Sequence, residues 1–284
     1  MTIYYTSSYL NTKVLEHVLM NTSFSASSAY IALFSGHPIN AGLAGELSGY
    51  GYLRVQAAFT VSGSVASNTS QINFPRATSM WANVAYCGIM DSITTGSGNV
   101  LFWGQLPVSK QPFGEETFFI NAGELRIGLG EGYSTYLAGK ILDHTLNNTT
   151  YTSPGLDVFA ALYSTLPNAN DSGGTEVSAS NYNRIRISGS SWMITIPPIA
   201  LSTPIVSSGN TGFGVIVNRM AVSKIDLPYC TDTTENWGVI SGLCLRDSSS
   251  GGNQLFRGSF TYPPTIVIDD SYNIKAGELE VQIG

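Results

Sequence analysis

One motif occurs twice in this chain, and that internal duplication constrains the fold more than any other feature. The pattern Tyr-Leu-x-x-Lys-x-Leu-x-His-x-Leu begins at Tyr9 and begins again at Tyr136. A second segment, Tyr30–Ser35, returns as Phe159–Ser164 at a slightly larger offset. Matched residue types in the same order indicate a duplicated structural unit. We therefore expect two tandem domains, a first copy at residues 1–130 and a second copy at residues 131–284.

Each copy is predicted to open with one short amphipathic helix. The apolar residues from Leu10 onwards recur at i, i+4, i+5, i+8 and i+9, which forms a single stripe on a helix. The second copy repeats this stripe between Leu137 and Leu146. Ser8 or Thr12 is the expected N-terminal cap of the first helix, because serine and threonine hydroxyls accept from free helical amides.

The residues after each helix are typical of short strands. Tyr30–Phe34 is a run of aromatic and aliphatic residues that suits a buried strand. Gly- and Asn-rich turns lie between two further apolar runs in each copy, which is a hairpin signal. The sequence thus predicts a mainly β chain with two tandem antiparallel β-sandwich domains, each carrying its helix at the front.

The second copy carries an insertion. The segment from Val55 to Trp81 in the first copy is half as long as the matching segment from Ile185 to Trp237 in the second. The additional residues fall at about 188–236, a stretch rich in proline, and we expect an elaborated loop or an extra hairpin there. Loops on a shared scaffold are where specificity is commonly added.

Composition excludes several classes of protein. Charged residues make up 11% of the chain, the net charge is -6 and no run of lysine or arginine occurs, which argues against binding to nucleic acid. No secretory signal and no apolar run of about 20 residues is visible, so no membrane span is expected. Cys87, Cys230 and Cys244 are predicted to be small buried residues, with a Cys230–Cys244 disulfide as the alternative.

The duplicated histidines His17 and His144 are the first candidate site. Histidine suits a metal ligand or a pH-sensitive contact. Neither helix has a second histidine, cysteine or carboxylate at ligand spacing, so we interpret both as solvated or interdomain helix residues.

Two glutamate–arginine pairs and two aspartates also recur. Glu46 with Arg54, and Glu176 with Arg184, are interpreted as an ion pair or loop anchor shared by the scaffold, with a substrate-binding pair as the alternative. Asp91 and Asp247 precede the hairpin turns and are expected to hydrogen-bond the local backbone. The remaining candidates are Trp81 and Trp237, predicted to pack in the core, with stacking on sugars together with exposed tyrosines as the alternative.

Catalytic and cofactor motifs are absent from the sequence. It has no Gly-x-Ser-x-Gly elbow, no His-Glu-x-x-His pair and no phosphate-binding Gly-rich loop. We therefore expect no catalytic residue, no cofactor and no metal site, and we do not expect an enzyme.

The order of motifs resembles a domain of tailed bacteriophages that is described as tail-fibre-like, head-fibre or capsid decoration (cement) protein. The match covers most of both copies and is best in the first, where Leu101–Gly104 and Ala122–Leu125 are intact. The second copy departs from it at Arg257, where the first has Trp103, and in the insertion. The resemblance implies a β-sandwich and a structural role in the virion, following synthesis in the bacterial host cytoplasm.

The first functional hypothesis is a capsid decoration protein that bridges and stabilises major capsid subunits, since tandem domains reach two equivalent lattice sites with a high effective concentration. The alternative is a tail, baseplate or fibre-adaptor component, and the third is a host-glycan-binding module. Expected partners are the major capsid protein or other virion proteins, with a homo-oligomer in the particle and neither nucleic acid nor membrane. The candidate partner contacts lie in the N-terminal arm and the insertion: Met1, Thr2, Ile3, Tyr4, Tyr5, Trp192, Pro197, Pro198, Phe213 and Tyr229.

Overall fold

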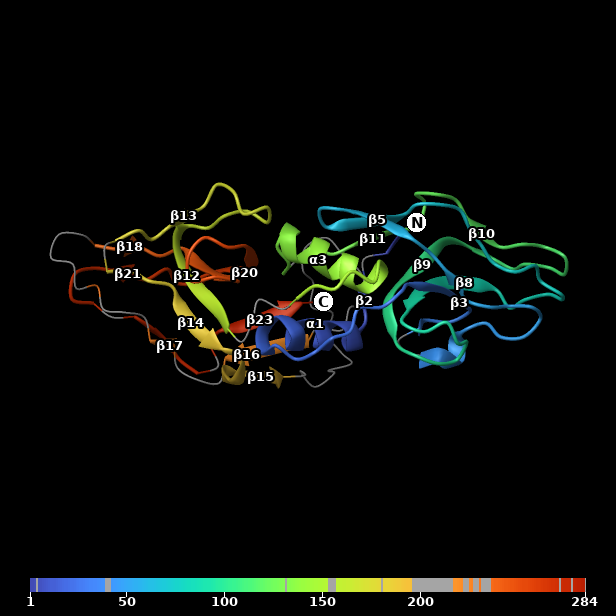
Figure 1. The fold of residues 1–284 in the computed structure, drawn as a ribbon, viewed down its shortest axis with the longest axis horizontal. Coiled ribbons are helices and arrows are strands. Elements are labelled where there is room, and N and C mark those ends of the chain that lie inside the picture. The colour runs from blue at the N-terminus through green and yellow to red at the C-terminus, as the bar shows by residue number, and fades with distance from the viewer. Residues whose placement is uncertain are drawn as a thin grey trace.

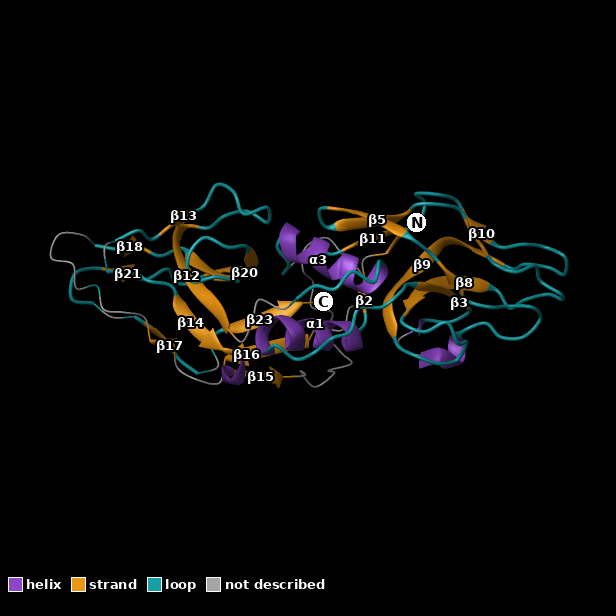
Figure 2. Cartoon of the chain, viewed as in Figure 1, coloured by secondary structure: helices purple, strands orange, loops and turns teal. Residues whose placement is uncertain are grey.

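The computed structural model contains two β-rich halves with two helices between them (Figures 1 and 2). It describes residues 1–3, 5–38, 42–130, 132–152, 157–179, 181–195, 217–221, 225–226, 230, 236–270, 272–276 and 278–283. The prediction of a mainly β, duplicated fold with one helix at the front of each copy is confirmed. Among the described strands, all pairings are antiparallel except that of the first strand of the chain.

The first copy is built on a five-stranded sheet in the order β2-β9-β8-β3-β4. A four-stranded sheet, β1-β11-β6-β5, and a two-stranded ladder, β10-β7, complete it, and a short 3-10 helix η1 (Gly42–Gly45) follows β3. The strand bounds are β1 (Thr2–Ile3), β2 (Tyr5–Thr6), β3 (Tyr30–Phe34), β4 (Val55–Gln56), β5 (Phe59–Ser62), β6 (Val65–Asn68), β7 (Ile72–Asn73), β8 (Val84–Met90), β9 (Val100–Lys110), β10 (Phe119–Ile120) and β11 (Arg126–Gly128).

The second copy repeats this plan with the sheet β13-β12-β19-β20, in which β14 also pairs with β12, and with a smaller sheet β15-β16-β23. Two ladders, β17-β22 and β18-β21, lie beyond them, and a 3-10 turn η2 (Gly189–Ser191) precedes β15. The strand bounds are β12 (Asp157–Thr165), β13 (Thr175–Glu176), β14 (Ile185–Ser188), β15 (Trp192–Thr195), β16 (Val217–Ala221), β17 (Ile225–Asp226), β18 (Gly238–Val239), β19 (Gly242–Arg246), β20 (Gln254–Ser259), β21 (Thr265–Ile266), β22 (Asn273–Ile274) and β23 (Glu280–Ile283).

Most of the insertion lengthens one connection of a hairpin that both copies share. In β5-β6 only Gly63 and Ser64 separate the paired residues Ser62 and Val65. In the equivalent β15-β16 hairpin, the whole segment 196–217 separates the paired Thr195 and Asn218. The predicted insertion at about 188–236 therefore grows out of a scaffold turn, and most of its residues lie outside the described ones.

Both helices are capped by serine. Helix α1 (Ser8–Met20) begins after Ser7, whose Oγ accepts from the amide of Leu10 at 3.1 Å, and α3 (Thr135–Leu146) repeats this with Ser134 and Leu137. The cap is thus Ser7, and the expectation of Ser8 or Thr12 was wrong. Helix α1 ends at Met20 and is capped by Asn21, whose left-handed φ of 53° matches the tolerance of asparagine for that conformation.

Each helix packs against strands of the other copy as well as its own. Helix α1 lies on β9 of the first copy and on β12, β15 and β16 of the second, whereas α3 lies on β20 of the second copy and on β5 and β6 of the first. This reciprocal exchange makes one continuous apolar core that includes residues of both copies. The two halves are therefore joined through their cores, with α1 and α3 lying between them (Figure 1).

Candidate functional site

A buried glutamate–arginine pair recurs at the same place in both copies. Arg54 binds Glu46 with two parallel hydrogen bonds of 2.6 and 2.7 Å, and its Nη1 donates to the carbonyls of Ser92 and Ser97 in the β8-β9 turn. Arg184 binds Glu176 in the same way and holds the β19-β20 turn. The interpretation of both pairs as loop anchors is confirmed.

The aspartates at these turns also behave alike. The Oδ1 atoms of Asp91 and Asp247 accept from the amides of Asn99 and Asn253 at 2.6 Å, as expected for Asp before a tight turn. Asn99 and Asn253 also donate their side-chain amides to the second carboxylate oxygen. These bonds fix the hairpin turns and leave both aspartates with a structural role.

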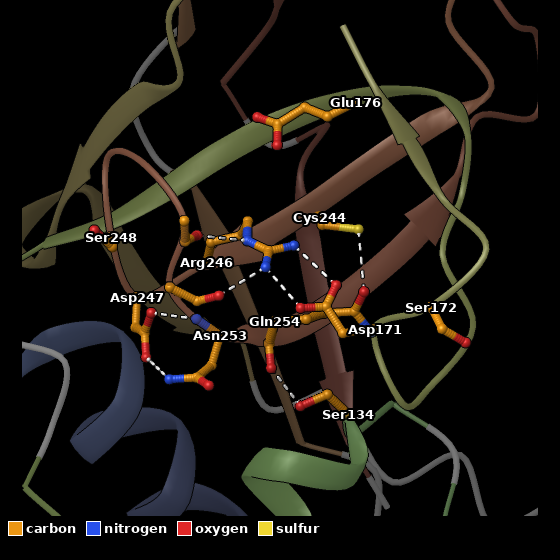
Figure 3. A network of polar contacts seen from close by, with 12 residues as sticks. Ser134, Asp171, Ser172, Glu176, Cys244, Arg246, Asp247, Ser248, Asn253 and Gln254 are labelled. Carbon is orange, nitrogen blue, oxygen red and sulfur yellow. Dashed lines mark hydrogen bonds and ion pairs between the residues drawn. The ribbon is translucent and has the colours of Figure 1, made fainter.

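A polar cluster distinguishes the second copy from the first, on the outer face of its main sheet. The Arg246 guanidinium lies at its centre (Figure 3). It donates to Asp171 Oδ1 and Oδ2 at 2.9 and 2.6 Å, to the Tyr163 hydroxyl at 2.7 Å and to the carbonyls of Gly251 and Gly252. Each N–H group of the Arg246 guanidinium therefore has an acceptor. A buried charge requires this, and Arg246 is only 6% exposed.

The loop between β12 and β13 is held onto this cluster by three side chains of β19 and β20. Arg246 binds Asp171, Gln254 donates to the carbonyl of Asn168 at 3.2 Å, and Arg257 donates to the carbonyl of Pro167 at 2.8 Å. Asp171 itself adopts a left-handed φ of 61°, which orients its carboxylate from a tight turn. Arg257, which stands where the first copy has Trp103, thus anchors this loop.

A cavity of about 280 Å³ opens beside the cluster, which we call the second-copy cavity. Its lining combines the arginine–carboxylate pairs Arg246–Asp171 and Arg184–Glu176 with Tyr163 and the backbone of the β12-β13 loop. Burial raises the pKa of Tyr163 to about 12, so its phenol keeps its proton at neutral pH. Burial likewise raises the pKa of Cys244 to about 12, which excludes thiolate chemistry there.

The duplicated histidines meet between the two halves. The His17 and His144 rings stack with centroids 5.6 Å apart, and both are buried. The amide of Tyr151 donates to His144 Nδ1 at 3.0 Å, and His17 Nε2 lies 2.9 Å from the Tyr151 carbonyl. The interdomain interpretation is confirmed and the solvated alternative is wrong, because each helix packs on the opposite copy.

The other predicted residues are distributed between the core and the surface. Trp81 and Trp237 are buried at 2% and 5% exposure, which confirms core packing. The three cysteines are buried and no disulfide joins Cys230 to Cys244. Within the described part of the chain, no group of three potential metal ligands occurs and no helix is long and apolar enough to span a bilayer.

The candidate partner contacts fall into three groups. Met1 and Tyr5 are half-buried and Thr2 is exposed, while Ile3 and Trp192 are buried in the core of this chain. Strands β1 and β2 fold the N-terminal arm onto the first copy, with Tyr5 stacked on Trp103 at 4.6 Å. The remaining candidates lie outside the described residues: Tyr4, Pro197, Pro198, Phe213 and Tyr229.

The comparison with protein families matches the duplicated architecture. The family described as podophage GP4 fiber I protein gp80 matches residues 5–128 and, a second time, residues 132–282. The chain belongs to this family. Members of this fibre family are phage virion structural proteins, and the two matches coincide with the two copies of the fold. Among curated proteins, none matches the chain.

Sequence reasoning missed the polar cluster of the second copy. Tyr163, Asp171, Arg246 and Gln254 belong to no recognised motif, and none was predicted as a site residue. A signal was nevertheless present, because aligning the copies shows polar residues of the second at apolar positions of the first. In this chain, the outer face of the main sheet is therefore polar in the second copy and apolar in the first.

Proposed function

We propose that this chain is a non-enzymatic fibre subunit that joins other proteins of the phage particle. The observation that carries the proposal is the reciprocal packing of α1 and α3, which links residues 1–130 and 131–284, the two proposed domains, through a continuous core. A linked pair of domains transmits a load between partners at its two ends, whereas domains on a flexible linker do not. The printed description of the family, a fibre protein, supports the same role.

The loops of the first copy that carry Tyr50, Met80 and Phe113 offer a surface for a protein partner. Tyr50, Met80 and Phe113 expose 60%, 50% and 57% of their surface. Their loops are bonded together, since the Trp81 Nε1 donates to the Tyr50 carbonyl and the Trp81 amide donates to the Pro112 carbonyl. Exposed aromatic and Met side chains gathered on linked loops are typical of protein contacts.

The N-terminal arm and the insertion remain proposed contacts. Thr2 and Tyr5 of the arm, and the segment between Thr195 and Asn218 that contains Pro197, Pro198 and Phe213, distinguish the two copies from one another. The low charge of the chain, 11% of residues, favours close packing of copies, and we propose a homo-oligomer in the particle.

Capsid decoration is the second candidate function. The observation that favours it is the presence of two similar domains in one chain, which suits two neighbouring equivalent sites on a capsid lattice. In both candidates the chain is made in the host cytoplasm and carries out no catalysis.

A copy count in purified particles tests both candidates. Sedimentation separates particles, emptied shells and detached tails, and quantitative mass spectrometry compares this chain with the major capsid protein in each. A fibre subunit is expected in few copies, retained with the assembly that bears the fibres. Copies that follow the major capsid protein through shell fractions support decoration, and absence from the particle overturns both.

A further inference from the structure

The second-copy cavity occupies a position that the first copy fills with apolar side chains. In the first copy, the equivalent sheet face buries Phe34 and Met90 against Val100 and Leu43 of η1. The strand registers equate these positions directly, because Met90 faces Val100 as Arg246 faces Gln254. The polar replacements in the second copy are Tyr163 for Phe34, Arg246 for Met90 and Gln254 for Val100. A buried polar network, even when fully hydrogen-bonded, is often no more stabilising than apolar side chains of similar volume, so stability alone does not explain this change.

The charges of the cavity balance. Arg246 faces Asp171 and Arg184 faces Glu176, each through two hydrogen bonds with a carboxylate. An anionic ligand would have to displace a carboxylate from a bidentate pair, among the strongest polar contacts in proteins. The cavity is therefore suited to a neutral ligand.

The cavity retains both a hydrogen-bond donor and a hydrogen-bond acceptor for a ligand. The Tyr163 oxygen accepts from Arg246, and no acceptor for its own hydrogen is found among the described residues. It is protonated at neutral pH and lines the cavity, so it is a donor available to a ligand.

Glu176 supplies the complementary acceptor. In the first copy, Glu46 Oε2 accepts from the amide of Gly96 at 2.8 Å, and the Glu46 side chain is 1% exposed. The matching turn of the second copy, between Asp247 and Asn253, is shorter, and among the described residues Glu176 Oε2 accepts only from Arg184. The Glu176 side chain is 25% exposed and lines the cavity, so one of its oxygens has room for another donor.

We infer that the second-copy cavity binds a neutral sugar residue. Neighbouring sugar hydroxyls both donate and accept, which matches the phenol donor of Tyr163 and the carboxylate acceptor of Glu176. A volume of about 280 Å³ is just below the usual range of ligand pockets and fits one ring rather than a chain of rings. The site uses polar side chains and does not use the buried Trp237. It does not depend on where the chain sits in the particle.

Binding of methyl glycosides to the full chain tests this inference. The probes are the methyl α-glycosides of glucose, galactose, mannose and rhamnose, titrated to about 50 mM with NMR detection, enough to measure millimolar dissociation constants. At least one probe is expected to bind. Tyr163→Phe, which restores the first copy's residue and removes one hydroxyl, is expected to weaken binding about threefold to tenfold.

Matched variants separate the cavity from the rest of the surface. Tyr262→Phe makes the same chemical change at an 88% exposed side chain and is expected to leave binding unchanged. Arg246→Met restores the first copy's residue and is expected to abolish binding, and Arg186→Met, at a mostly exposed arginine outside the cavity, is its control. Thermal melting confirms that each variant is folded, and Tyr163→Phe tests the inference even where Arg246→Met does not fold.

Three results overturn the inference. The first is that none of the four glycosides binds the wild-type chain. The second is that binding survives Tyr163→Phe and Arg246→Met unchanged, which puts the sugar elsewhere. The third is that inorganic phosphate or acetate binds in the cavity while the glycosides do not, which makes it an anion site.

Discussion

The first and second copies share a scaffold but differ in what covers the outer face of the main sheet. The first covers it with apolar side chains, in a cluster around Phe34 and Met90. The second covers it with a hydrogen-bonded network centred on Arg246. The buried ion pair next to this face is common to both, so the scaffold tolerates either solution. One copy of the duplicated scaffold therefore has an apolar cluster on this face, and the other has polar groups and a cavity.

Each copy depends on the other to complete its hydrophobic core. Each helix completes the core of the opposite copy, and the two histidines stack where the helices meet. A domain that resembles its neighbour in sequence is therefore not an independent unit.

The largest effect is expected from separating the copies. A chain of residues 1–130 alone loses α3 from β5 and β6 and exposes the face of α1 that packs on β15 and β16. Since exposed apolar surface costs about 25 cal/mol per Å², we expect no stable monomer, but aggregation or an exchanged dimer that replaces α3 with a second α1. Light scattering and circular dichroism measure this, and a folded monomer contradicts the exchange.

The next largest effect concerns the two ion pairs. Arg54→Met leaves Glu46 as an uncompensated buried charge, so the free energy of unfolding is expected to fall by about 3–5 kcal/mol. Arg184→Met leaves the more exposed Glu176 partly solvated, and we expect about 1–2 kcal/mol. Urea unfolding of both variants gives the difference. Equal losses would contradict the interpretation that Glu176 is better solvated than Glu46.

A smaller effect is expected from exchanging the aromatic residues of the two copies. Phe34→Tyr places a hydroxyl in an apolar cluster, and we expect a loss of about 1–3 kcal/mol. Tyr163→Phe removes one hydrogen bond to Arg246 and should cost about 1 kcal/mol. Urea unfolding compares the two. A neutral Phe34→Tyr would indicate an unoccupied polar space in the first copy.

The smallest effect is a pH dependence at the stacked histidines. Burial, followed by the neighbouring His17, lowers the pKa of His144, while hydrogen bonds with the backbone of Phe24 and Thr149 oppose this. The unfolded chain then binds the proton more readily, so stability is full above about pH 6.5 and falls as pH is lowered through that value. Protonated Nδ1 would also face the Tyr151 amide without an acceptor.

Melting temperatures between pH 7.5 and pH 5, compared for wild type and His144→Gln, measure this dependence. The wild type should lose more stability than the variant as the pH falls. Identical slopes would contradict the expected contribution of His144 to the pH dependence.

Sequence reasoning identified the elements governed by local pattern. The helix stripe from Leu10, the strand at Tyr30–Phe34 and the turn aspartates Asp91 and Asp247 follow from periodicity and turn chemistry, and all are confirmed. The N-terminal cap was misplaced because Ser7 and Ser8 are chemically equivalent in sequence. Only the backbone geometry of Ser7, with φ -80° and ψ 157°, decides between them.

Other features had no local signal. His17 and His144 lie off the apolar stripe of their helices, so a solvated location was as consistent with the pattern as an interdomain one. The cluster of Tyr163, Asp171 and Arg246 joins residues up to 83 positions apart, and such contacts arise only when β12, its following loop and β19 come together.

The sequence by itself determined the duplication, the mainly β class and the family, because these depend on repeated order and on residue periodicity. The tertiary structure decided which copy each helix completes and which sheet face is polar, because both depend on which surfaces meet. Periodicity specifies that a face is buried, but the partner that buries it is set by the whole chain. The same helix stripe that predicted an amphipathic element therefore could not say that it would lie on the opposite copy.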